Sequence, residues 1–202
     1  MNNFDNILWM PVDIPKYQYK KDLIDNFVGD SPPDDGTGAQ AFQYQKFTTT
    51  NKNYSKSSWI EESSLTKYID KNLPIDHLVN VRINNYLKAT EMHIDFLTPD
   101  KNADLWKHEK SLQPCGYRMT IQYDNNIKNP YIQKNNGETV LAKMPIDTDW
   151  CVIRSTDTTH GGNYDPDRFI LFTHFWVNKQ KHYEILKRSI NKYKDYIIYE
   201  EE

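Results

Sequence analysis

From residue 75 onward, hydrophobic and polar residues alternate with a period of two, which is typical of β-strands with one buried face. The alternating segments are residues 75–96 (with a break at 88–91), 117–123 and 139–144, the last preceded by the turn signal Asn136-Gly137. Two dense apolar runs, 150–153 and 169–177, predict further strands, and the polar stretch 154–168 separates them.

Helical spacing replaces this alternation at two places. Residues 61–72 predict a helix that Pro74 ends, because proline cannot continue a helix. After Asn178, apolar residues recur every three or four positions, which predicts an amphipathic C-terminal helix with a solvated Lys-rich face. Its apolar residues are Tyr183, Leu186, Ile190, Tyr193 and Ile197. The Pro- and Gly-rich residues 30–38 predict a surface loop that could serve as a substrate lid.

Strands do not alternate with helices in the βαβ manner, so the pattern does not indicate a parallel sheet. It favours a mainly β fold with flanking helices (α+β), built as an antiparallel sandwich or a double-stranded β-helix (jelly-roll) core. We expect residues 1–202 to form a single domain. Within it, residues 1–75 support the core, 76–177 form the core, and 178–202 form the C-terminal helix.

Composition narrows the class of protein. Aromatic residues make up 13% of the chain, which is too many for a disordered protein. The net charge of −3 argues against general affinity for nucleic acid or anionic membranes. No long apolar run or signal-like N-terminus is present, so we expect a cytoplasmic protein without a membrane partner. Cys115 and Cys151 lack a CxxC spacing and are expected to be buried, reduced thiols.

Three segments carry residues suited to a metal site. On a strand, His93 and Asp95 point to the same face, and an imidazole with a carboxylate makes two-thirds of a facial triad for non-haem Fe(II). His160 precedes two glycines, and a double-sheet roll can bring it beside the first pair. Arg168 opens an apolar strand, where it must reach solvent or meet an anion such as a dicarboxylate. Taken singly, each is also explained by an ordinary core or surface residue.

The order of these segments resembles that of the Fe(II)/2-oxoglutarate-dependent dioxygenases, in particular their prolyl 4-hydroxylase-like branch. The collinear motifs, within residues 78–177, are Asn85-Tyr86, His93-Ile94-Asp95, Arg118-Met119-Thr120-Ile121-Gln122-Tyr123, Asn136-Gly137-Glu138-Thr139, His160-Gly161-Gly162 and Arg168. Three positions depart from the family pattern. Asn136 replaces the first Gly of a G-G-E-T turn, Arg168 replaces a Lys and comes early, and Asp124 replaces the Leu of a Tyr-Leu-Asn motif.

The resemblance implies a jelly-roll core in which His93, Asp95 and His160 are the catalytic ligands of Fe(II). It also implies that 2-oxoglutarate binds at the metal as co-substrate, with its far carboxylate held by Arg168 and by the Tyr123 hydroxyl. The implied reaction uses O₂, converts 2-oxoglutarate to succinate and CO₂, and hydroxylates a C–H bond. A peptidyl prolyl residue, another amino-acid side chain or a small molecule is the expected substrate.

Three more residues are candidate substrate contacts: Arg154, Arg118 and Tyr86. Arg154 has the strand parity of His160, although a predicted bend separates them. By alternation, Arg118 faces outward if Tyr123 faces inward.

Two other classes stay open at this point. One is a jelly-roll protein that binds Zn²⁺ or Mn²⁺ without 2-oxoglutarate chemistry, against which the presence of Arg168 argues. The other is a binding or structural module in which His93, Asp95 and His160 lie on unrelated surfaces.

Overall fold

A computed structural model describes residues 4–25, 39–46, 64–86, 90–93, 117–121, 130–155, 158–162 and 165–200. The elements in chain order are η1 (Phe4–Asn6), β1 (Ile7–Pro11), α1 (Lys20–Asp25), β2 (Ala39–Lys46), α2 (Ser64–Asn72), β3 (Ile75–Tyr86), β4 (Thr90–His93), β5 (Tyr117–Thr120), β6 (Tyr131–Gln133), β7 (Thr139–Leu141), β8 (Trp150–Ile153), β9 (Thr159–Gly162), β10 (Asp165–Val177), α4 (Lys179–Tyr193), η4 (Lys194–Tyr196) and β11 (Ile198–Tyr199).

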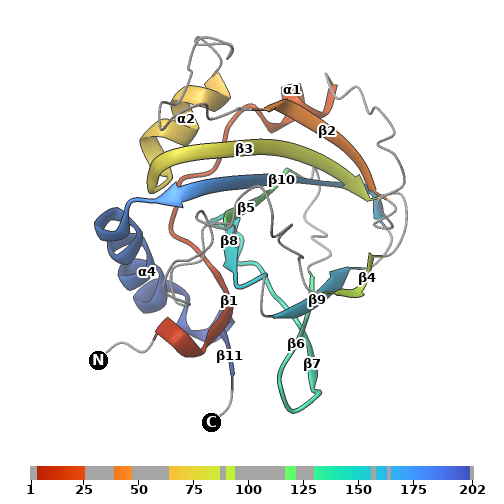
Figure 1. Ribbon diagram of the computed structural model, residues 1–202, viewed down its shortest axis with the longest axis vertical. Helices are drawn as coiled ribbons and strands as arrows, with labels where there is room; N and C mark the ends of the chain where they lie inside the picture. The colour runs from red at the N-terminus through yellow and green to blue at the C-terminus, as the bar shows by residue number, and fades with distance from the viewer. Residues whose placement is uncertain are drawn as a thin grey trace, which may run out of the picture.

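The strands form two antiparallel sheets. The large sheet has seven strands in the order β11-β1-β8-β5-β10-β3-β2, and the small sheet has four in the order β4-β9-β6-β7. In Figure 1 the long strands β3 and β10 run side by side across the molecule, and the small sheet lies below them. The mainly β architecture with few helices agrees with the α+β class expected from the sequence.

The two faces of the large sheet bury different cores. One face packs against the helices, where Leu65 and Ile69 of α2 and Ile185 of α4 join Met119 and Leu171 of the sheet. The opposite face looks toward the small sheet, where a second cluster joins strands of both sheets. Its members are Leu8, Trp9, Ile132, Ala142, Cys151, Ile153 and Ile198. The space between the sheets is therefore reached by side chains from β1, β8 and β11 on one side and from β6 on the other.

The helices follow the predicted pattern with one correction. α2 ends at Asn72, before Pro74, and α4 begins after Asn178, whose side chain accepts a hydrogen bond from the Lys181 N–H. The prediction of a helix through Ile197 is wrong. α4 ends at Tyr193, and β11 instead pairs with β1 at the edge of the large sheet. Pairing and burial of Ile198 outweigh a spacing that also fits a helix.

Several strands lie where the pattern predicts none, among them β6 and β9 of the small sheet. β6 is only three residues long, and β9 has the sequence Thr-His-Gly-Gly inside the polar stretch 154–168. Neither shows a run of alternating apolar residues, so tertiary pairing determines both strands. The turn between β6 and β7 is as predicted, with Gly137 at a φ of 87°. Cys151 is buried, as expected. The predicted loop at 30–38 and Cys115 lie outside the described residues.

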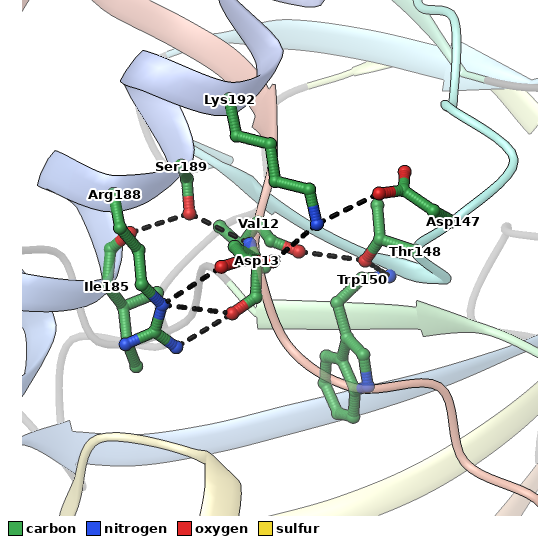
Figure 2. Close-up of polar contacts among 9 residues, drawn as sticks. All are labelled: Val12, Asp13, Asp147, Thr148, Trp150, Ile185, Arg188, Ser189 and Lys192. Atoms are coloured by element: carbon green, nitrogen blue, oxygen red, sulfur yellow. Dashed lines mark hydrogen bonds and ion pairs between the residues drawn. The ribbon is translucent and has the colours of Figure 1, made fainter.

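A polar network attaches α4 to the segment that follows β1 (Figure 2). The Ser189 hydroxyl accepts a hydrogen bond from the Asp13 backbone N–H at 2.8 Å and donates to the Ile185 carbonyl at 2.6 Å. Lys192 lies 2.7 Å from Asp13 and 2.8 Å from Asp147. α4 is thus held by a buried hydroxyl and by ion pairs at the surface. None of the helices in the described part of the chain is long and apolar enough to cross a membrane.

Candidate functional site

The first candidate ligand and the distal histidine are neighbours in the small sheet. β4 pairs with β9 in antiparallel register, and this register places His93 directly opposite His160. The two imidazole centroids are 4.6 Å apart. Two histidines that are distant in the sequence are therefore brought together by strand pairing.

His160 is fixed in the orientation that a metal ligand needs. It is 3% exposed, and its Nδ1 lies 2.9 Å from the Thr158 carbonyl oxygen. Because a carbonyl can only accept, Nδ1 carries the proton and Nε2 of the neutral ring carries the lone pair. Metal-binding histidines are commonly oriented in this way, by a hydrogen bond from the other ring nitrogen to a carbonyl or carboxylate.

The third predicted ligand cannot be placed. β4 ends at His93, and Asp95 lies outside the described residues. Among the residues that the structure does describe, no group of three His, Cys, Asp or Glu side chains is close enough to hold a metal ion. The described part of the site therefore supplies two imidazoles of a predicted three-ligand set.

Arg118 extends from the large sheet to the histidine pair. It lies opposite Cys151 of β8 and Phe172 of β10, on the face that looks toward the small sheet. Its Nη2 is 3.4 Å from Nε2 of His160, and its guanidinium carbon lies 4.7 Å from the Phe172 ring centroid. Only 8% of Arg118 is exposed. The expectation that Arg118 faces outward was tied to an inward Tyr123, and the observed register places Arg118 inward.

Arg154 has a different environment. Val152, two residues earlier, packs with Met10 and Leu186 on the helix side of the large sheet. Arg154 lines a small cavity on that side together with His182 and Leu186 of α4. The described contacts therefore do not bring Arg154 to the histidine pair.

The other predicted site residues are described only in part. Arg168 belongs to β10, and Tyr86 pairs with Asp165 where β3 meets β10. These assignments concern the backbone, since the side chains of Arg168 and Tyr86 are not among the described ones. Tyr123 lies outside the described residues, so its predicted contact with 2-oxoglutarate stays a prediction.

Comparison with models of known protein families gives no match, and comparison with curated protein sequences gives no match either. The site must therefore be interpreted from its own geometry and from the motif resemblance.

A second buried polar pair lies on the opposite face of β5. The Tyr117 hydroxyl is 2.8 Å from Nδ1 of His182 in α4. Burial lowers the pKa of His182 from 6.5 to about 4 and raises the pKa of Tyr117 far above its usual value. At neutral pH both groups are therefore uncharged, and they share one hydrogen bond. This pair joins α4 to the sheet and faces away from His160.

Two contributors to the site were not predicted. The Thr158 carbonyl orients His160, and Phe172 supports the guanidinium of Arg118. A backbone carbonyl leaves no signal in the residue types. Phe172 is a hydrophobic residue in an apolar run, which does not stand out as a site residue.

Proposed function

We propose that this protein is an Fe(II)- and 2-oxoglutarate-dependent dioxygenase that hydroxylates a C–H bond. The observation that carries the proposal is the pairing of His93 with His160, with Nε2 of His160 in the metal-binding tautomer. A second, independent contribution is the ordered set of motifs in the sequence. Random placement of two histidines would not put them opposite each other at the positions where the motif order expects ligands.

The strand order supports the finer fold proposal, a double-stranded β-helix. From β3 to β10 the chain passes repeatedly between the sheets, with β3, β5, β8 and β10 in the large sheet and β4, β6, β7 and β9 in the small one. Repeated passage between two facing antiparallel sheets is the pattern of a jelly roll. In this arrangement the ligand strands β4 and β9 are neighbours, and β10, which carries Arg168, lies in the facing sheet.

In this proposal His93, Asp95 and His160 hold the iron, which when bound supplies the redox chemistry with O₂. The His160 ring is already oriented and His93 faces it from the next strand, so the donor set fits once Nη2 of Arg118, 3.4 Å from Nε2 of His160, gives up that contact to the metal. Arg168 and Tyr123 hold the far carboxylate of 2-oxoglutarate. Arg118, Arg154 and Tyr86 are the proposed substrate contacts, of which Arg118 has support from its position beside His160.

The test is anaerobic titration of the protein with Fe(II) and 2-oxoglutarate, followed by visible absorption. The expected result is the weak charge-transfer band of the iron-bound 2-oxo acid. His160→Gln, which keeps size and polarity but is a poor iron ligand, should abolish the band and the formation of succinate. Thr159→Ala changes the adjacent, partly exposed residue and should leave both unchanged.

The outcomes separate the alternatives. A protein that binds Zn²⁺ or Mn²⁺ through His160 but gives no band with Fe(II) and 2-oxoglutarate is a metal protein of another kind. A protein whose metal binding is the same in wild type and in His160→Gln does not use the histidine pair as a metal site. The oxygenase proposal is then wrong.

A further inference from the structure

A polar cavity lies between one end of the small sheet and the β1–β11 edge of the large sheet. Its volume is about 280 Å³, and its wall comes mainly from the β6–β7 turn, the start of β9 and the residue that follows β11. In Figure 1 this turn and β11 both lie at the lower end of the molecule. Pockets for drug-sized molecules measure about 300–1,000 Å³, so a ligand of this cavity is small.

Glu200 gives the cavity a carboxylate that is held in place. Its Oε1 and Oε2 lie 3.0 Å and 3.2 Å from the backbone nitrogen of Asn135, so the two oxygens share a single N–H donor. A carboxylate has about four acceptor sites, and one N–H leaves most of them open. Within the described part of the chain, no cationic side chain forms an ion pair with Glu200. Its charge is therefore left for a ligand.

The lysine in the wall does not supply the balancing charge. Nζ of Lys134 lies 2.8 Å from Oε2 of Glu138, so these two side chains neutralise each other. Glu200 is the only acidic residue among the described residues that line the cavity. Divalent cations such as Ca²⁺ take about six to eight oxygen ligands, whereas a protonated amine is satisfied by one carboxylate and neutral acceptors. The charge of the wall therefore favours an ammonium group.

The rest of the wall is largely neutral and polar. Gln133 and Asn135 contribute amides, and Thr158 contributes a hydroxyl. Thr158 is 2% exposed, and its carbonyl accepts from His160. Its hydroxyl oxygen has no hydrogen-bond partner among the described residues, which is unfavourable for a buried polar group. Hydroxyl groups of a ligand match such a wall because they both donate and accept hydrogen bonds.

We propose that this cavity binds a small hydroxy-amine, with its ammonium group at the Glu200 carboxylate and its hydroxyl groups along the amides and Thr158. The site is separate from the paired histidines and does not depend on the proposed oxygenase function.

The experiment compares hydroxy-amines with alcohols of similar shape that lack the charge: ethanolamine with ethylene glycol, 2-amino-1,3-propanediol with glycerol, and glucosamine with glucose. Calorimetric titration of the full chain measures binding at neutral pH, in phosphate buffer of constant ionic strength, because salt screens exposed charges. At least one amine should bind, and its matched alcohol should bind at least about tenfold more weakly. Neither Fe(II) nor 2-oxoglutarate is present, so the result is independent of the oxygenase proposal.

Variants then assign the binding to this cavity. Glu200→Gln keeps an acceptor for the Asn135 N–H but removes the charge, so it should weaken amine binding at least about tenfold and make amine and alcohol equivalent. Glu184→Gln is the matched control, because it removes the same charge from an exposed position on α4, and it should bind the amine as the wild type does. Thr158→Val keeps the shape and the carbonyl but lacks the hydroxyl, so it should weaken amine and alcohol alike and keep the preference between them.

Four results would overturn the proposal. The first two are that no amine in the panel binds the wild type, or that amine and alcohol bind equally well. The third is that Glu200→Gln and Glu184→Gln weaken amine binding to the same extent, which would mean that net charge and not the cavity attracts the amine. The fourth is that Thr158→Val binds the amine as tightly as the wild type, which would place the amine outside this cavity.

Discussion

At the scale of single residues, two polar pairs lie on opposite faces of the large sheet, one at the proposed site and one in the core under α4. Arg118 and Tyr117 are adjacent in β5, so their side chains leave the strand on opposite faces. Arg118 meets His160 between the sheets, and Tyr117 meets His182 under α4. The first pair lies at the proposed site. The second lies in a core made of helix and sheet and contributes to stability.

The buried His182 should make the stability of the protein depend on pH. Its pKa is about 4 in the folded chain and near 6.5 when exposed, so between these values the unfolded chain binds a proton that the folded chain does not. The free energy of unfolding should therefore fall as the pH is lowered from about 6.5 to about 4, by about 2–3 kcal/mol. Urea unfolding across this range measures the effect.

His182→Gln is the variant that isolates this contribution. The glutamine amide can still form a hydrogen bond with the Tyr117 hydroxyl, but the side chain does not titrate. The drop in stability between pH 6.5 and 4 should be smaller in His182→Gln than in the wild type. An identical drop in both proteins would show that other groups cause the pH dependence.

At the scale of elements, the network around Asp13 allows a direct comparison of buried and exposed contacts (Figure 2). Ser189 is fully buried, and its hydroxyl accepts a hydrogen bond from the Asp13 N–H. Because Ser189→Ala leaves that donor without its partner, it should lower the free energy of unfolding by about 1–3 kcal/mol. The Lys192 side chain is 43% exposed, and ion pairs of exposed side chains contribute little to stability. Lys192→Met should therefore lower the free energy of unfolding by less than about 1 kcal/mol. Urea unfolding at low and high salt distinguishes them.

Salt is the informative variable in that comparison. Ions screen the contacts of Lys192 with Asp13 and Asp147, so the effect of Lys192→Met should shrink in high salt. The effect of Ser189→Ala should stay the same. A larger loss for Lys192→Met than for Ser189→Ala would mean that the surface ion pairs are the main attachment of α4.

The elements also show what the sequence could and could not predict. Strands such as β8 and β10 were predicted because burial requires apolar side chains, and α2 ends where proline requires it. β9 was not predicted, because its sequence Thr-His-Gly-Gly shows no alternation of apolar residues. It forms a strand because it pairs with β4 and β6. β11 was assigned to a helix because the spacing of Ile197 also fits a helix.

The same limit applies to the candidate site. Residue chemistry and motif order predicted His93 and His160 as ligands. Their position opposite each other depends on the register of β4 against β9, which the sequence alone does not determine. The inward direction of Arg118 likewise follows from its place opposite Phe172. The residue types were readable from the sequence, whereas their mutual positions come from long-range strand pairing.

At the scale of the whole molecule, the predicted peripheral segments are integral to the large sheet. β1 and β2 come from residues 1–75 and β11 from residues 178–202, and they occupy both ends of the strand order. β1 also pairs with β8, one strand away from β5 and Arg118. These segments therefore form part of the framework that faces the small sheet, and the two sheets together position the proposed site.

Ligand binding between the sheets should consequently stabilise the molecule as a whole. A ligand that binds only the folded chain at 100 times its Kd adds about 2.7 kcal/mol, which for a domain of this size raises Tm by about 5–10 °C. Mn²⁺, a redox-stable substitute for Fe(II), should raise Tm, and 2-oxoglutarate should add a further increment only when the metal is present. His160→Gln should remove both increments.

Arg168→Ala should keep the increase in Tm from the metal and lose most of the increase from 2-oxoglutarate, because the guanidinium holds the far carboxylate and not the ion. If Arg168→Ala instead lost the increment from the metal, Arg168 would serve the metal site or the packing of β10, and the carboxylate would be held by another residue.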